Sequence, residues 1–228
     1  MSTRVPFTTS DLADHQWGID DALTGDPNTN ILTGDAGGSL LDFSRGGNDT
    51  FTETAPSTYT FYGDAARSLF NFARGGDDTF TVSSSSTTTA YGDAGDDMSD
   101  HSKGGNDTFT GAAQASNIFF GDAGGNMIGH AQGGDDRFTA FPNSFNTFYG
   151  DAGVDMSDHS KGGNDTFEPH QRGRQHFLWR RREQHVWPCS RWRRPFHGQE
   201  RLQQRFLRGH QRRYVGLQQG RQRHFQWR

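Results

Sequence analysis

The chain has 228 residues, of which 30% are hydrophobic, and its mean hydropathy is −0.90. This composition is too poor in Leu, Ile and Val for an ordinary globular core, and no apolar run approaches the length that crosses a membrane. The net charge of −4 conceals a division, because residues 1–167 carry 24 acidic and 7 basic residues whereas residues 168–228 carry 3 acidic and 16 basic residues.

Residues 1–30 carry isolated apolar side chains among polar ones, such as Val5, Leu12 and Trp17. We interpret this segment as an N-terminal cap, because a stack of repeats needs its open end covered. The segment is too short for a catalytic domain. It also lacks a basic start followed by an apolar stretch, so we expect no cleavable signal peptide.

Residues 31–167 form a tandem array of five 29-residue units. The hexad Gly-Gly-Asn/Asp-Asp-Thr-Phe, with Arg once at its fifth place, begins at Gly46, Gly75, Gly104, Gly133 and Gly162. The tripeptide Gly-Asp-Ala begins at Gly34, Gly63, Gly92, Gly121 and Gly150. Two markers in one phase identify a repeat architecture. Hexads with Asn and with Asp at the third place alternate, so the duplicated unit is a pair of repeats of 58 residues.

Each unit offers short β-prone pieces between Gly-Asp or Gly-Asn turns, which predicts strands of only a few residues. One slot is apolar in every unit: Leu40, Leu69, Met98, Met127 and Met156. A second slot is aromatic or imidazole: Phe43, Phe72, His101, His130 and His159. Like side chains at a fixed period can stack on one another in a solenoid. We therefore predict an all-β fold, a parallel β-roll or β-solenoid of 29-residue repeats, in which the histidines are members of a stack rather than metal ligands.

The tail, residues 168–228, is Arg-rich and contains no Asp. We interpret it as the same repeat in a shifted reading frame. Trp has the single codon TGG, which becomes a Gly codon when it is read one base later, and Trp179 and Trp192 lie 29 residues after Gly150 and Gly163. The segment 220–225 can likewise be encoded so that the shifted frame spells the hexad. The hypothesis places a frameshift, genuine or a sequencing error, between Phe167 and Gln175.

An alternative interpretation of the tail is nucleic-acid binding, since arginines with interleaved aromatic residues bind phosphates and stack on bases. The shifted frame accounts for the same composition without selection for binding. We therefore expect no specific nucleic-acid partner and a disordered tail.

The intact repeats resemble the RTX, or hemolysin-type, calcium-binding family, whose nonapeptide is Gly-Gly-x-Gly-x-Asp-x-apolar-x. The resemblance covers residues 34–167. It implies calcium ions between successive turns, held by Asp carboxylates and backbone carbonyls. By position, the Gly and Asp places of the hexads match Gly47 and Asp49, Gly76 and Asp78, Gly105 and Asp107, Gly134 and Asp136, and Gly163 and Asp165. In the second type of row, Asp97 and Asp155 match the Asp place.

The second type of row departs from the family pattern. Asp stands where the nonapeptide has its second Gly, and we include these residues as candidate ligands: Asp35, Asp64, Asp93, Asp122 and Asp151. The Asp place itself holds Ser39, Ser68 or Asn126 in three copies. The period of 29 is not a multiple of nine, so longer segments must separate the calcium-binding turns.

A physical argument supports calcium independently of the resemblance. Ca²⁺ takes six to eight oxygen ligands, and Gly lets the backbone bend so that carbonyls point inward. Acidic turns stacked in adjacent rows repel one another, by roughly 4 kcal/mol for two charges at 4 Å in a medium of effective dielectric 20. We therefore expect the repeats to be largely disordered without calcium and to gain β structure with it.

The favoured function is a calcium-binding repeat protein, and the resemblance implies export by type I secretion machinery to the extracellular space. There are two alternatives. A metal-free structural or adhesive solenoid would use Asp only to cap turns. An enzyme is disfavoured, because catalysis needs one distinct constellation in a pocket whereas these Asp residues repeat uniformly.

Overall fold

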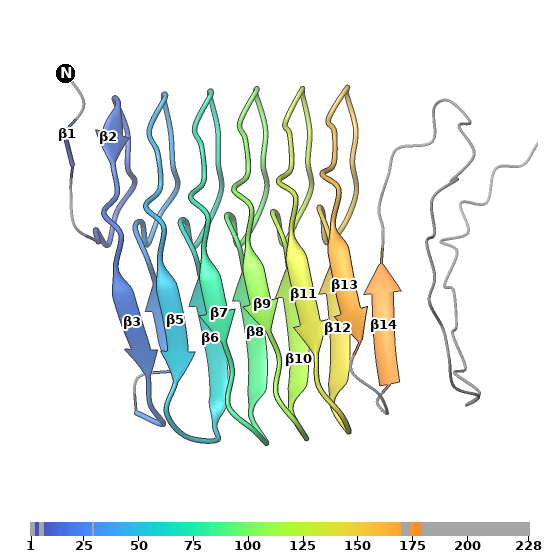
Figure 1. Ribbon diagram of the computed structural model, residues 1–228. Helices are drawn as coiled ribbons and strands as arrows, with labels where there is room; N and C mark the ends of the chain where they lie inside the picture. Colours follow the sequence, from blue (N-terminus) through green and yellow to red (C-terminus); the bar gives the residue numbers. More distant parts are fainter. Residues whose placement is uncertain (1–2, 5–6, 29, 170–173, 179–228) are drawn as a thin grey trace, which may run out of the picture.

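The computed structural model describes residues 3–4, 7–28, 30–169 and 174–178. The described chain is a parallel β-solenoid without helices, in which successive rows lie side by side along one axis (Figure 1). The predicted fold class is therefore confirmed. The frameshift and the disorder predicted for the tail concern residues most of which lie outside the described part of the chain. Residues 168–169 and 174–178 are in strands that extend the two sheets, so the disorder predicted for them is wrong.

Two six-stranded sheets run along the axis, and every strand pair in them is parallel. The first sheet contains β4 (Ile31–Thr33), β6 (Thr58–Tyr62), β8 (Thr87–Tyr91), β10 (Ser116–Phe120), β12 (Phe145–Tyr149) and β14 (Arg174–Leu178). The second sheet contains β3 (Ala22–Gly25), β5 (Thr50–Glu53), β7 (Thr79–Thr81), β9 (Thr108–Thr110), β11 (Arg137–Ala140) and β13 (Thr166–Pro169). A separate pair consists of β1 (Thr3–Arg4) and β2 (Gln16–Trp17).

The register places each residue beside its equivalent in the next row. Phe51 pairs with Phe80, and Tyr62 pairs with Tyr91, each 29 residues apart. Because side chains alternate between the two faces of a strand, this register keeps every core position in the core and every surface position on the surface. The repeat period of the sequence is thus the length of one row.

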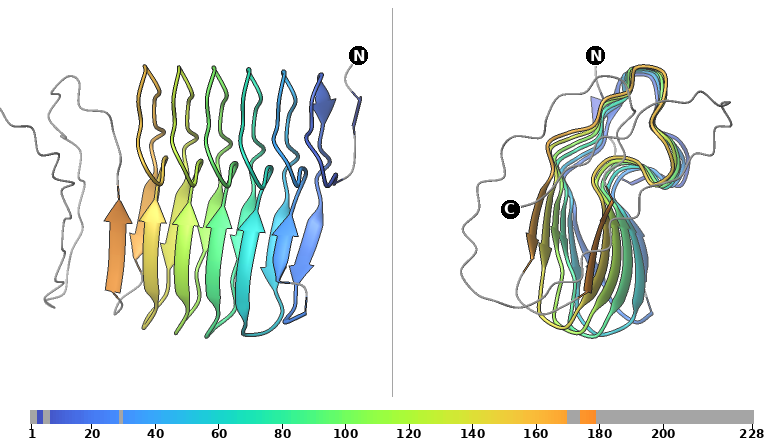
Figure 2. Two further views of the ribbon diagram at one scale, coloured as in Figure 1. Left: turned by 180° about the vertical axis from the view of Figure 1, so that it is seen from behind. Right: turned by 90° about the vertical axis from the view of Figure 1, so that its right-hand side faces the viewer.

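The cross-section of the solenoid has two lobes, and Figure 2 shows that the rows superimpose when viewed along the axis. In the lower lobe the two sheets face each other and enclose a core of aromatic side chains, including Phe51, Phe61, Phe80 and Phe109. The upper lobe consists of the segments between the two strands of a row, such as residues 63–78 between β6 and β7. It has its own core, formed by the Ala of Gly-Asp-Ala and the Leu/Met slot.

Stacked side chains run along the axis as predicted. The rings of Phe80 and Phe109 lie 4.7 Å apart and those of Phe109 and Phe138 lie 4.9 Å apart, and all three side chains are fully buried. The histidine slot also stacks, with 4.7 Å between the rings of His101 and His130. This second stack lies on the surface rather than in the core, since Phe43 and Phe72 in the same slot are about half exposed.

The surface stack stands on turns with an unusual backbone. Two successive residues in each row have positive φ, for example Asp100 (53°) with His101 (67°) and Gly129 (57°) with His130 (71°). Asn, Asp and Gly tolerate this left-handed conformation best, and one of these three precedes the ring residue in every row. Phe and His thus stack from a left-handed backbone conformation that costs these residues free energy.

The segment interpreted as a cap contains a turn of the solenoid. Thr8, Leu12 and Trp17 form bridges to Ala36, Leu40 and Arg45, each 28 residues further along the chain. Strand β3 pairs with β5 at the same spacing. Leu12 is buried in the core of the upper lobe. The N-terminal segment thus covers the array with a row that lacks the hexad and the Gly-Asp-Ala marker.

Candidate metal centre

Two columns of aspartates lie where the upper lobe joins the sheets. The Asp of each Gly-Asp-Ala comes two residues after a strand of the first sheet, and the last Asp of each hexad comes one residue before a strand of the second sheet. We call them the first column and the second column. The first contains Asp35, Asp64, Asp93, Asp122 and Asp151. The second contains Asp49, Asp78, Asp107, Asp136 and Asp165.

The first column connects the two sides of one row. Asp93 Oδ1 accepts a hydrogen bond of 2.7 Å from the backbone N–H of Gly105, which lies 12 residues later in the hexad of the same row. The same bond is formed by Asp35 with Gly47, by Asp64 with Gly76, by Asp122 with Gly134 and by Asp151 with Gly163. The five hexad glycines predicted as ligand positions therefore donate their N–H groups to carboxylates that were predicted for the same site.

The second column connects one row to the next. Asp78 Oδ1 accepts a 2.6 Å hydrogen bond from the N–H of Asp49, and Asp107 Oδ1 accepts a 2.7 Å bond from the N–H of Asp78. The series continues through Asp136 to Asp165. Each carboxylate thus uses one oxygen to hold the preceding row in register.

The other oxygen of these carboxylates has no hydrogen-bond partner although it is buried. This is so for Oδ2 in all five members of the second column. In the first column one oxygen each of Asp35, Asp93 and Asp122 also lacks an N–H or O–H donor, and the carboxyls of adjacent rows lie close enough to share a proton. A buried polar atom without a partner costs about 1–3 kcal/mol, and more when it carries charge. Eight such oxygens in register constitute a repeated defect that a bound cation would remove.

Oxygen atoms converge beside the glycines of this region. A Cβ built on Gly63 would collide with Asp78 Oδ2 and with the carbonyl oxygen of Gly92 in the next row. A Cβ on Gly75 would collide with carboxylate oxygens of Asp93 and Asp64, which belong to adjacent rows. Glycine is required at these positions because the space that a side chain would need is already occupied by oxygen atoms.

Burial raises the pKa of these aspartates. It raises the pKa of Asp49 from 3.8 to about 8, and the nearby charge of Asp35 acts in the same direction. The pKa of Asp93 rises to about 7 by burial, although the N–H of Gly105 opposes the shift. In the middle of the array, burial together with neighbouring carboxylates holds the pKa of Asp78 and Asp107 well above the usual range. Without a metal, burial therefore favours the protonated, neutral form of these carboxyls at neutral pH.

Asp97 and Asp155, the remaining predicted ligands, lie outside the two columns. Asp97 Oδ1 accepts hydrogen bonds from the backbone and side-chain nitrogens of Asn126, and Asp155 Oδ1 accepts one from the N–H of Met156. They share a slot with Ser39 and Ser68, whose hydroxyl oxygens also accept an N–H from the next row. From Ser39 to Asn126 this slot is a hydrogen-bonded ladder between rows, whereas the printed bond of Asp155 lies within its own row.

One hydrogen-bonded ladder, at the third place of the hexad, was not predicted from the sequence. Asp77 Oδ1 accepts both the backbone N–H and the side-chain amide of Asn106, and Asn106 Oδ1 in turn accepts the N–H of Asp135. Asn alternates with Asp along this exposed ladder, so that carboxylates are two rows apart and each Asn can donate to an Asp. The 58-residue period was the signal that could have revealed it.

Hard divalent cations fit the two columns chemically, since the donors are carboxylate and carbonyl oxygens and the region contains no thiolate or imidazole. Within the described residues, no three acidic, His or Cys side chains converge on one point in the manner of a side-chain metal site. An ion between rows would therefore take much of its coordination from backbone carbonyls. The sequence-based expectation of mixed carboxylate and carbonyl ligands is compatible with this arrangement.

Two further observations bear on the class of protein. Among the described residues no helix has the length and apolar character to span a bilayer. Comparisons of the chain with models of protein families, with curated proteins and with solved structures gave no match.

Proposed function

We propose that the chain binds calcium ions between the rows of its solenoid, at the two aspartate columns. The observation that carries the proposal is the set of buried carboxylate oxygens without partners, repeated in register beside backbone carbonyls. A divalent cation neutralises two carboxylates at once, so it removes both the unpaired oxygens and the repulsion between rows. Calcium suits the site better than magnesium, because it accepts irregular sets of six to eight oxygens.

Calcium binding in this form would supply folding free energy. The unfolded chain does not hold the two columns together, so ions that bind the folded rows stabilise them by mass action. Each row shares hydrogen-bonded carboxylates with its neighbours, and folding of one row therefore favours the next. The same behaviour is implied by the resemblance to the RTX family, which also suggests type I secretion into an environment where calcium is abundant.

The test is equilibrium dialysis of the full chain against calcium, with the bound metal counted by mass spectrometry. We expect several calcium ions per chain. The variant Asp78→Asn, Asp107→Asn, Asp136→Asn should bind fewer ions. A matched variant changes three exposed aspartates, Asp96→Asn, Asp100→Asn and Asp158→Asn, and should bind as many as the wild type. Equal losses in both variants would show only a general attraction of calcium to an acidic chain.

A metal-free structural solenoid is the second candidate, and one observation favours it. In both columns at least one carboxylate oxygen accepts a backbone N–H, which is what an aspartate that only caps a turn would do. A structural role predicts that a chelator leaves the melting temperature unchanged at neutral pH. A role in binding calcium predicts a large decrease.

A further inference from the structure

The basic residues of the array are concentrated in one slot. Residues 31–167 contain six basic residues, and four of them immediately precede a hexad: Arg45, Arg74, Lys103 and Lys161. Gln132 occupies the same slot in the remaining row. The two lysines are the only lysines of the whole chain. We call this slot the basic ladder.

The ladder lies in register on the surface. Backbone bridges join Arg45 to Arg74, Arg74 to Lys103, Lys103 to Gln132 and Gln132 to Lys161, and all four basic side chains are exposed. Neighbouring rows of a sheet are about 4.8 Å apart, so a line of positive charges runs parallel to the solenoid axis at roughly that spacing. Like charges directly opposite each other in a sheet are destabilising.

Pairing with the acidic side chains does not explain the ladder. Within the described residues none of its four basic side chains forms an ion pair, and the ion pair found there, Arg137 with Glu168, is elsewhere. The aspartate columns accept hydrogen bonds from backbone N–H groups, not from these cations. In an array with more than three acidic residues for each basic one, four cations in one line form no ion pair within the described residues, and only Arg45 has a cation–π contact, with Trp17, so the line calls for an external partner.

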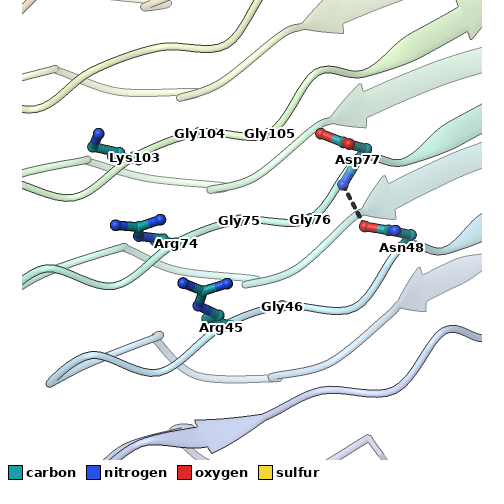
Figure 3. A pocket seen from close by; sticks show the side chains of 10 residues that line it. All are labelled: Arg45, Gly46, Asn48, Arg74, Gly75, Gly76, Asp77, Lys103, Gly104 and Gly105. Atoms are coloured by element: carbon teal, nitrogen blue, oxygen red, sulfur yellow. Dashed lines mark hydrogen bonds between the residues drawn. The ribbon is translucent and has the colours of Figure 1, made fainter.

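An open groove accompanies the ladder. Its floor is the glycine backbone at the start of each hexad, such as Gly75 and Gly104, and the basic side chains of Arg45, Arg74 and Lys103 line it. Figure 3 shows these three side chains following one another on one side of the glycines, with Asn48 and Asp77 on the other side. The groove thus has a cationic wall, a flat floor without side chains, and a wall of amide and carboxylate groups.

We propose that this groove binds a linear acidic polysaccharide that lies along the solenoid axis. Its sulfate or carboxylate groups would face the basic ladder, and its hydroxyl groups would donate hydrogen bonds to the carboxylate of Asp77 and the amide oxygen of Asn48 on the opposite wall. None of the described residues that line the groove is aromatic, and Trp17, beside the ladder, is covered by the guanidinium of Arg45 at 5.3 Å from its ring centroid, so the groove offers single-stranded nucleic acids little surface for stacking. The inference goes beyond calcium binding and does not require it, although bound calcium would reduce the negative field around the groove.

The first test labels lysines in the full chain, because Lys103 and Lys161 are the only side-chain amines. The protein is acetylated in calcium-containing buffer with dextran sulfate, with uncharged dextran or with a thymidine oligonucleotide, and the labelled peptides are measured by mass spectrometry. We expect dextran sulfate to slow acetylation of both lysines by about tenfold, while the N-terminal amine reacts as before. Unprotected lysines would overturn the proposal. If the oligonucleotide protected the lysines more strongly than dextran sulfate, the ligand would be a nucleic acid and the proposed polysaccharide would be wrong.

The second test separates the ladder from the Arg-rich tail, which attracts any polyanion. Arg45, Arg74, Lys103 and Lys161 are changed together to Gln, a residue that the slot already accepts at Gln132. The matched variant, Arg67→Gln, Arg137→Gln, Arg205→Gln and Arg208→Gln, removes the same charge elsewhere. Only the ladder variant should lose about tenfold in affinity for dextran sulfate. Equal losses in the two variants would contradict a specific groove.

Discussion

The carboxylate of a second-column aspartate performs two tasks with its two oxygens. In Asp107, Oδ1 accepts the N–H of Asp78 in the preceding row, and Oδ2 is buried without a partner. The first task needs only an acceptor, which an amide oxygen also provides. The second needs a negative charge for a cation. Substitution by Asn therefore separates the structural task from the metal-binding task at a single residue.

For Asp107→Asn we predict opposite effects with and without calcium. In a chelator the variant should fold to a greater extent than the wild type, because the amide requires neither a buried charge nor the uptake of a proton on folding while the hydrogen bond remains. In calcium it should be less stable, with an affinity lower by about tenfold, or ~1.4 kcal/mol. Thermal unfolding followed by circular dichroism measures both. Asp100→Asn, at an exposed turn, is the control and should change neither value.

An aspartate that only capped its turn would give another result. The Asn variant would then have the same stability relative to the wild type in both buffers, since capping does not involve the second oxygen.

The aromatic side chains allow two contributions to stability, burial and ring stacking, to be compared. Phe109 lies between Phe80 and Phe138 and also contacts Phe119 on the facing sheet, and its side chain is fully buried. Phe72 has comparable ring contacts with Phe43 and His101, but it lies on the surface stack and is about half exposed. The two positions therefore separate burial from stacking.

Phe109→Ala should destabilise the calcium-loaded protein by about 3–5 kcal/mol, the usual cost of emptying a buried aromatic site. Phe72→Ala should cost about 1 kcal/mol, which is the order of the stacking contribution alone. Urea unfolding in saturating calcium gives both values. Equal costs at the two positions would mean that the lower lobe does not depend on its buried core.

The Asn/Asp ladder should be sensitive to the order of its charges. Asn106→Asp would place carboxylates in three successive rows, at 77, 106 and 135, and remove the amide donor to Asp77. We expect a loss of about 1 kcal/mol at low salt, decreasing as added salt screens the exposed charges. Unfolding midpoints at low and high salt measure it. Asn106→Ser, which removes the donor without adding charge, should show little dependence on salt.

At the scale of elements, the sequence predicted most of the fold for a simple reason. A fixed period forces equivalent residues such as Leu69 and Met98 into contact in a solenoid, so the repeat itself specifies the register. The period could not show which slots face inward, and the surface position of the His101 stack was unexpected. The N-terminal row was also hidden, because residues 8–25 have the 28-residue spacing without the repeated motifs.

The candidate site was predictable only in part. The nonapeptide pattern indicated Asp78 and Gly76. It did not show that the N–H of Gly76 donates to Asp64, which lies 12 residues earlier in the sequence and on the other side of the same row. Asp97 fits the same pattern yet belongs to a hydrogen-bonded ladder elsewhere. Spacing along the chain does not show which turns face each other in the folded row.

For the whole molecule the raised pKa values predict an inverted dependence on pH in the absence of calcium. An aspartate such as Asp49, with a pKa of about 8 in the folded state, binds more protons folded than unfolded at pH between its ordinary value of 3.8 and 8. Folding stability should therefore decrease as pH rises through this range. We expect the chelated protein to have more β structure and to melt at a higher temperature at pH 5 than at pH 8, where it is weakly structured.

Calcium should reverse this trend. Protons compete with the metal for the same carboxylates, so calcium affinity should increase from pH 5 to pH 8, and the calcium-loaded protein should be more stable at the higher pH. Melting curves at both pH values, with calcium and with chelator, show whether the two trends cross. If stability changed with pH in the same direction in both buffers, the buried carboxylates would not be the ligands of the metal.

The most direct measurement is the far-ultraviolet circular dichroism of the full chain at pH 8, recorded in chelator and during titration with calcium to millimolar levels. We expect a weakly structured chain in chelator that gains a β spectrum as calcium is added and loses it again when chelator is restored. A β spectrum of full intensity in chelator that calcium leaves unchanged would show that the rows fold without calcium.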